Sequence, residues 1–135
     1  MAEEDVVRRV MPHNIEAEQS VIGAMLMDEE AIETVSETLR EEDFYARQYG
    51  QYFATITELH RKGIAVDPVT LQNALKDKNL PPEVYGNEAI MNLIDQVPTS
   101  ANVKYYASIV SEKSILRSMI RANEEIAGAC YAQTQ

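Results

Sequence analysis

Cysteine is almost missing from this chain, tryptophan is missing, and so are long apolar runs. Cys130 is the single cysteine among 135 residues, so the chain cannot form an internal disulfide or a paired-cysteine metal site, which favours a reducing cytoplasm. No apolar run approaches the roughly 20 residues that a membrane-spanning helix needs. The first ten residues place acids ahead of two arginines, with no apolar core after them, which does not fit a secretory signal. We therefore expect a soluble, cytoplasmic protein, with residues 1–11 as a mobile lead-in.

Basic residues are also scarce, and the excess of acids is concentrated in one part of the chain. The sequence holds 22 acidic and 12 basic residues, for a formal net charge of −10. Residues 1–43 contain thirteen acids and three bases, whereas residues 44–135 contain nine of each. Such a surface repels phosphate, so we expect no direct binding of nucleic acid by this chain. The clustered acids either keep a face solvated, which is the commoner role, or attract a basic protein partner.

Catalytic and cofactor motifs are absent from the sequence as well. It contains no GxxxxGK(S/T) phosphate loop and no GxGxxG dinucleotide motif, and His13 and His60 lack HExxH spacing. The acids at 16–18 and 29–33 could be imagined as a di-metal carboxylate set, but they lie on the predicted polar faces of their helices. We expect no enzyme activity, no cofactor and no metal. An enzyme built on dispersed acids is the alternative, which metal analysis and nucleotide-hydrolysis assays would detect.

The sequence does contain enough apolar residues for one folded domain. Hydrophobic residues make up 45% of the chain and charged residues 25%, and a domain of this size buries roughly two thirds of the surface that its unfolded chain exposes. The stretch GIAVD at 63–67 is the only candidate strand, and it is short. The predicted fold class is therefore all-α.

Helix-start and helix-stop residues divide the first part of the chain into about five predicted helices. Asn14, Asp28 and Asp67 are N-cap candidates, Pro68 suits a first helical position, and Gly63 is the expected stop of the third helix. Periodic apolar residues place the helices at 14–26, 29–39, 42–63, from about 68, and at 87–96. The acids that follow Asn14 are interpreted as partners of the helix dipole.

The last segment predicts one long helix, from residue 100 or 102 to about residue 131, of roughly 40 Å. At 100° per residue its apolar line contains Tyr105, Ile109, Leu116, Ile120 and Ala127, flanked by Met119, Asn123 and Cys130, with Ser111, Ser114, Ser118, Arg121 and Glu125 opposite. A small head cannot cover a helix of this length. Part of the apolar line should therefore protrude and need a partner.

Four motifs occur in order along the chain. They are Pro-x-Asn-x-Glu-Ala-Glu-Gln from residue 12, Asp-Phe-Tyr from residue 43, Asp-Pro-x-Thr-Leu from residue 67 and Val-Pro-Thr-Ser-Ala-Asn-x-x-Tyr-Tyr from residue 97. In this combination, residues 11–131 resemble the N-terminal domain of DnaB-type replicative DNA helicases. The resemblance implies a helical head at 12–99 and the first helix of an incomplete helical hairpin at 100–135, with the C-terminal RecA-like motor domain absent. ATP and Mg²⁺ would then be needed only by that motor domain.

The resemblance also implies partners. In this family the domains pair through their hairpins into a collar on a six-membered ring, and the collar recruits primase; a helicase loader is a further candidate partner. The implied self-association or primase-contact residues are Ile109, Leu116, Met119, Ile120, Ile126 and, more weakly, Ile90. Packing inside the hairpin or dimer is the alternative role for Ile120. The competing function is the helicase-binding domain of a primase, or another helical adaptor, which lacks the motifs at residues 12 and 97.

Overall fold

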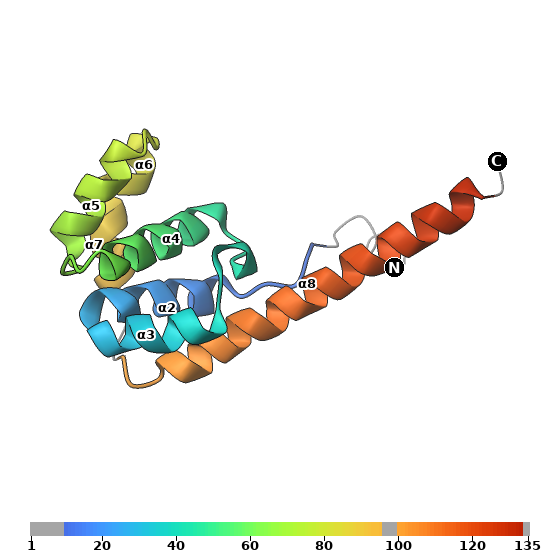
Figure 1. Cartoon of the computed structure of the whole chain (residues 1–135), viewed down its shortest axis with the longest axis horizontal. Helices are drawn as coiled ribbons and strands as arrows, with labels where there is room; N and C mark the ends of the chain where they lie inside the picture. Colours follow the sequence, from blue (N-terminus) through green and yellow to red (C-terminus); the bar gives the residue numbers. More distant parts are fainter. Residues whose placement is uncertain (1–9, 96–99, 134–135) are drawn as a thin grey trace.

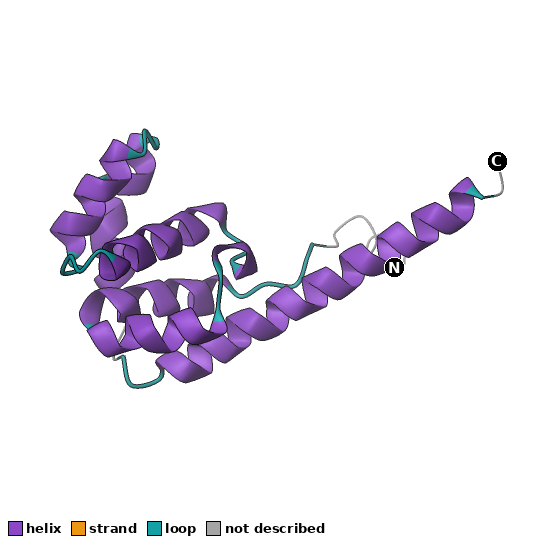
Figure 2. Cartoon of the chain, in the orientation of Figure 1, coloured by secondary structure: helices purple, strands orange, loops and turns teal. Residues whose placement is uncertain are grey.

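The computed structural model describes residues 10–95 and 100–133, which are helical almost throughout (Figure 1). The α-helices are α2 (Ile15–Met27), α3 (Glu29–Thr38), α4 (Arg47–Arg61), α5 (Pro68–Asp77), α6 (Pro82–Tyr85), α7 (Asn87–Asp95) and α8 (Val103–Ala132). Figure 2 shows no strand in these residues, which confirms the predicted all-α class. No helix of the described ranges is long and apolar enough to cross a membrane. The predicted lead-in lies outside the described residues up to residue 9.

The helix starts predicted from capping side chains are confirmed. The side-chain oxygens of Asn14 and Asp28 each accept a backbone N–H from the first turn that follows, at 2.9 and 3.0 Å. Asp67 forms a capping box with Thr70, in which each side chain bonds the backbone N–H of the other at 2.8 and 2.9 Å. These bonds satisfy N–H groups that have no partner inside the helix.

Two short elements were not predicted from the sequence. A 3-10 turn, η1 (Glu41–Asp43), occupies the start of the periodic segment 42–63, so α4 begins only at Arg47. The second is the single turn of α6, which begins at Pro82 directly after Pro81. A proline is tolerated there because the first N–H groups of a helix are unpaired in any case.

α2 is the central helix of the head. It packs against α3, α4, α7 and α8, and all of its residues from 21 to 26 are buried. A helix that is apolar nearly all round is typical of a core element. Figure 1 shows α5, α6 and α7 gathered above one end of α2 and α4. The core joins all these helices, and the fully buried side chains of Ile22, Ile32, Tyr52 and Leu71 each stabilise it by about 1.5–3 kcal/mol.

α8 is the longest element, with 30 residues and a length of about 45 Å. Its first half packs along α2 and α3, and Figure 1 shows the second half extending away from the head. All described residues from 121 onward are exposed. The head therefore covers only part of this helix, as its length predicted.

Candidate protein-interaction surface

The inner side of α8, which faces the head, carries short apolar side chains followed by two polar ones. Val103, Ala107 and Val110 are buried there, and the line continues through Ser114 to Arg117. Spacings of four and three residues place all five on one side of the helix. The sequence-based prediction that Ser114 lies on the outer, polar side is wrong. Small inner side chains allow α8 to lie close to α2 and α3, so the larger apolar residues remain outside.

Arg117 ends this inner line and is only 2% exposed. Its Nη1 donates a hydrogen bond to the carbonyl oxygen of Pro12 at 2.7 Å, and its Nη2 donates to that of Asp43 at 2.6 Å. One helical turn earlier, the hydroxyl of Ser114 donates to the carboxylate of Asp43 at 2.7 Å. A buried guanidinium needs such partners to offset the loss of its hydration. Together these bonds fix the point at which α8 leaves the head.

Glu18 is a buried acid beside this junction, with 1% of its surface exposed. Its two carboxylate oxygens accept the backbone N–H groups of Tyr45 and Ala46, at 2.8 and 3.0 Å. It thereby caps α4 from another helix, because the α4 cap residue Ala46 has no side-chain acceptor. Burial raises the pKa of Glu18, against the opposing effects of the two backbone hydrogen bonds and of the charges on Arg117 and His13.

The segment before α2 is tied to the same junction. The ring of His13 stacks on that of Tyr45, with centroids 4.1 Å apart and an 8° angle between the planes. Its Nδ1 lies 2.7 Å from the carbonyl oxygen of Met11. The guanidinium of Arg117 lies 5.7 Å from the centre of the Tyr45 ring, within the range of a cation–π contact.

Glu18 and Arg117 are the two residues that sequence reasoning missed. Glu18 was interpreted as a solvent-facing helix-start acid, although its spacing to Val21 and Met25 places it within the apolar stripe of α2. Arg117 lies seven residues, or about two helical turns, after Val110, and therefore on the same inner side of α8. A charged residue in register with an apolar stripe was the signal that could have identified both.

The outer side of α8 carries a regular line of mostly exposed residues, which we call the outer seam. It consists of Tyr105, Ile109, Glu112, Leu116, Met119, Asn123, Ile126 and Cys130. The spacing alternates between four and three residues, and this mean period of 3.5 is the geometry of a coiled-coil contact. Met119 and Ile126 are 57% and 62% exposed. A line of exposed apolar side chains on one helix is typical of a protein–protein contact.

Five of the six predicted contact residues lie on α8. Leu116, Met119 and Ile126 are exposed, whereas Ile109 and Ile120 are half-buried. The sixth, Ile90, lies on α7 and is 2% exposed. The side chain of Ile90 packs in the core of the head, so this structure does not present it to a partner.

The residues considered for chemistry do not converge. Within the described ranges, no group of three or more His, Cys, Asp or Glu residues could hold a metal ion. The two imidazole nitrogens of His60 lie 3.7 Å from carboxylate oxygens of Glu29 and Glu33, far from His13 at the start of α2. Cys130 is exposed on the projecting half of α8.

The described residues thus form an all-α domain in which a head carries one projecting helix with an apolar outer side. The family model for the DnaB-like helicase N-terminal domain matches residues 10–112. The chain belongs to this family.

Its relatives are replicative DNA helicases. The chain is 40% identical to the replicative DNA helicase DnaC of Bacillus subtilis and 41% identical to the replicative DNA helicase DnaB of Geobacillus stearothermophilus. Both matches cover 93% of this chain but only 28% of the relative. The chain therefore spans about a quarter of the length of these helicases and corresponds to their N-terminal domain.

Two solved structures have the same fold. The crystal structure of the N-terminal domain of DnaB helicase from Mycobacterium tuberculosis is 38% identical, with a TM-score of 0.89 over 93% of this chain and 89% of that one. The N-terminal domain of DnaB helicase from Helicobacter pylori, described with its interactions with primase, has a TM-score of 0.76 over 86% of this chain and 90% of that one. At 20% identity, the second likeness shows the fold alone.

Proposed function

We propose that this domain assembles the collar of a bacterial replicative helicase ring and recruits primase to it. The observation that carries the proposal is the outer seam of α8, because a monomer leaves its apolar residues in water. Burying such a seam against a second helix removes apolar area from water, at about 25 cal/mol for each Å². A second copy of the chain is the natural partner, since most soluble assemblies are symmetric pairs or rings of identical chains.

Two polar positions in the outer seam bear on its selectivity. Glu112 and Asn123 interrupt an otherwise apolar line, and a single polar residue in a coiled-coil seam fixes the register and the number of strands at some cost in stability. We therefore expect the two helices to pair in one preferred register rather than in several. A partner that binds one collar arrangement more tightly than another shifts the population toward it.

We propose that primase docks around the free half of α8, with Ile126 and Ile120 as contact residues. Support comes from the 62% exposure of Ile126 and from the Helicobacter pylori domain of the same fold, which is described with its interactions with primase. Ile120 is half-buried, so part of its surface is already covered within the chain. A helicase loader is a second candidate partner of the same collar.

This domain does not itself catalyse a reaction in the proposed function. The relatives are several times longer than this chain, and we assign nucleotide hydrolysis, with its ATP and Mg²⁺, to a separate RecA-like motor domain of the helicase. The domain itself needs no cofactor. We place it in the cytoplasm with the replication machinery, and the acidic excess of the chain argues against a direct hold on DNA.

Calorimetric titration of the chain with full-length primase from the same organism tests the recruitment. Ile126→Glu places a charge in the proposed contact, and we expect it to weaken binding by about tenfold or more. Val69→Glu, at a 72% exposed position on α5, is the control and should leave the affinity unchanged. Equal binding of primase to both variants would refute the assignment of this surface.

A further inference from the structure

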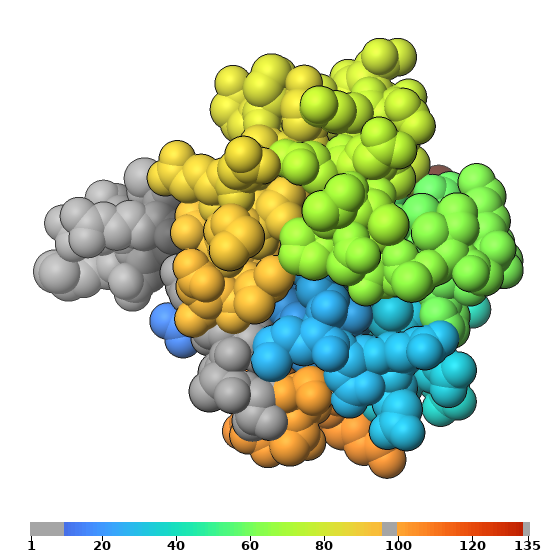
Figure 3. All heavy atoms as spheres, turned by 90° about the vertical axis from the view of Figure 1, so that its left-hand side faces the viewer, coloured from blue at the N-terminus to red at the C-terminus, as the bar shows by residue number. Residues whose placement is uncertain are grey.

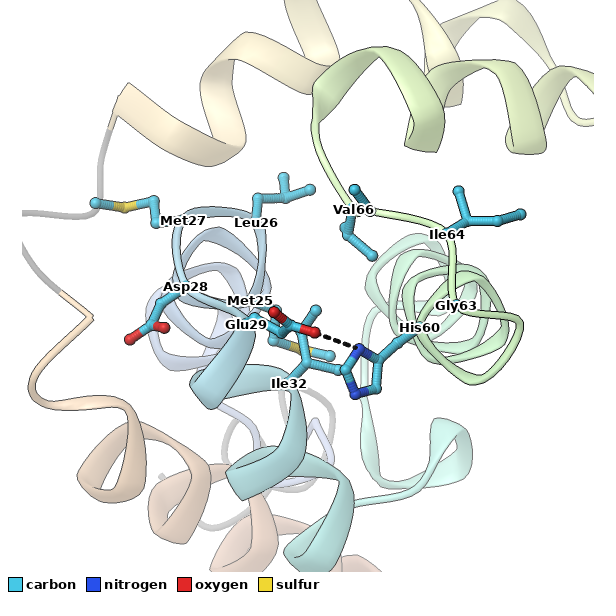
Figure 4. Close-up of a pocket in the computed structure, with 11 residues that line it drawn as sticks. Met25, Leu26, Met27, Asp28, Glu29, Ile32, His60, Gly63, Ile64 and Val66 are labelled. Carbon is cyan, nitrogen blue, oxygen red and sulfur yellow. Dashed lines mark ion pairs between the residues drawn. The ribbon is translucent and has the colours of Figure 1, made fainter.

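A second surface on the head has the features of a docking site. A hollow of about 290 Å³ lies where α2 ends, α3 begins and α4 ends. Its apolar walls come from Leu26 and Ile32 on one side and from Ile64 and Val66 on the other. Figure 4 shows Leu26 and Val66 on opposite sides of it, with His60 below. We call it the end hollow, and its volume is close to the lower limit of ordinary ligand pockets.

The walls of the end hollow are fixed by the fold. Gly63 adopts a left-handed conformation with φ of 77° after the last turn of α4, and the N–H of Ile64 donates back to the carbonyl oxygen of Leu59 at 3.0 Å. This is the helix-terminating pattern that holds the residue after the glycine against the last turn. Ile32 is 2% exposed and forms part of the core. The shape of the end hollow is therefore determined by the folded chain.

Two exposed apolar side chains stand at the rim of the end hollow. Met27 is 47% exposed and Ile64 is 42% exposed, and both line the hollow. Methionine adapts its shape to a partner because its side chain is unbranched and polarizable. Figure 4 shows Met27 and Ile64 beyond opposite walls of the hollow, with Leu26 and Val66 between them, so they would contact the residues on either side of a buried aliphatic group in an extended segment.

Apart from His60, the ionisable side chains at the end hollow are acidic. Asp28 and Glu29 line it, and Glu33 lies beside it, 3.7 Å from Nε2 of His60. The bases that follow His60 in the sequence point elsewhere, because Arg61 and Lys62 line different hollows. A ligand that enters this hollow therefore meets carboxylates without a neighbouring lysine or arginine.

We propose that the end hollow binds a linear segment of a partner protein that carries an aliphatic side chain flanked by lysine or arginine. The aliphatic group fills the space between Leu26, Ile32 and Val66. The cations face the carboxylates of Glu29 and Glu33, whose side chains are 79% and 66% exposed. Charge of opposite sign around an apolar contact speeds association and rejects acidic competitors. The acidic excess of the first third of the chain thereby gains a specific role.

The end hollow is separate from the outer seam. Figure 1 shows the free half of α8 leaving the head on one side, and the other end of the head faces the viewer in Figure 3, where the α2–α3 turn (blue) lies below α4 and α5 (green). A partner in the end hollow leaves the projecting part of α8 accessible. The domain could then hold a basic partner at the head while α8 is engaged in a collar, a capacity beyond the proposed function.

Nitrogen–proton correlation spectra of the 135-residue chain, titrated with three synthetic peptides, test this inference. The probe is acetyl-Lys-Lys-Leu-Leu-Lys-Lys-amide. One control replaces its lysines by glutamates, and the other replaces its leucines by serines. We expect the probe to shift the resonances of Met27, Ile64 and Val66, and each control to bind about tenfold more weakly.

A matched pair of variants localises the binding. Ile64→Ser removes one rim residue and should weaken the probe several-fold, whereas Val69→Ser, at an exposed position outside the hollow, should not. Equal binding of either control peptide would overturn the proposal, because it would reduce the contact to charge alone or to apolar surface alone. Shifts centred on α8, or concentration-dependent shifts at the hollow without peptide, which would indicate a second copy as the occupant, would overturn it as well.

Discussion

The guanidinium of Arg117 donates a hydrogen bond of 2.6 Å to the carbonyl oxygen of Asp43, 74 residues away in the sequence. This contact, with the bond from Ser114 to the same residue, joins α8 to the turn that precedes α4. The direction in which the outer seam leaves the head therefore depends on a buried polar junction. Disturbing the junction should alter the stability of the domain, whereas disturbing the seam should alter only its assembly.

Arg117→Met should destabilise the domain by about 2–4 kcal/mol in urea denaturation, because methionine fills the space but leaves two partly buried carbonyl oxygens without these donors. Arg121→Met is the matched control, one turn further along α8 at an exposed position. It should change the free energy of unfolding by less than about 0.5 kcal/mol. Similar effects of the two substitutions would show that the junction is not what holds α8.

Glu18→Gln should cost about 1–3 kcal/mol of stability, since an amide offers one acceptor oxygen where two backbone N–H groups need one each. Glu16→Gln, at an exposed position in the same helical turn, should be nearly neutral. Chemical denaturation of both variants at neutral pH measures the difference. An unaffected Glu18→Gln variant would contradict the capping role.

The same residue predicts a pH dependence. Burial raises the pKa of Glu18 above its ordinary value of 4.5, so the folded state binds its proton more tightly than the unfolded state. The stabilisation of the folded state that comes from proton binding at Glu18 is then fully present below pH 4.5. It declines as the pH rises through the folded-state pKa. Denaturation of the wild type and Glu18→Gln over a series of pH values should give a stability difference that shrinks with rising pH. A difference that grows with pH would mean that the hydrogen bonds outweigh burial.

Two glycines should respond in opposite directions to the same substitution. Gly63→Ala forces a side chain into a left-handed conformation at φ of 77°, which costs about 1–2 kcal/mol. Gly128→Ala lies in the exposed part of α8 with no atom near the added group, and it should stabilise the helix by up to about 1 kcal/mol. Thermal unfolding followed by circular dichroism distinguishes the two. Equal shifts in the same direction would contradict the assigned conformation at Gly63.

The sequence predicted the helices and their ends better than the orientation of α8. Caps such as Asp28 and Asp67 act within one helical turn, so local sequence determines them. The side of α8 that faces the head is instead the side that can pack closely against other helices. Small residues such as Ala107 and Ser114 lie on that side. A pattern search weighted toward large apolar residues selects the outer seam and assigns Ser114 to solvent.

The polar junction could not be predicted by the same reasoning. The buried positions of Glu18 and Arg117 are favourable only because each finds partners from distant segments, and those partners are defined by the folded chain. The candidate contact residues on α8 were easier to propose, because a helix of this length had to expose part of its apolar side. The same reasoning failed for Ile90, because this apolar residue was proposed as a partner contact but is buried in the core.

Sedimentation equilibrium over a concentration series measures whether the outer seam pairs two chains, with Met119→Glu on the outer seam compared with Met91→Glu on α7. The two methionines are 57% and 50% exposed, so the substitutions differ in location and little else. We expect the wild type and Met91→Glu to associate as concentration rises, while Met119→Glu remains monomeric with unchanged stability. A wild-type chain that stays monomeric throughout, or a Met119→Glu variant that associates as the wild type does, would contradict pairing through the outer seam.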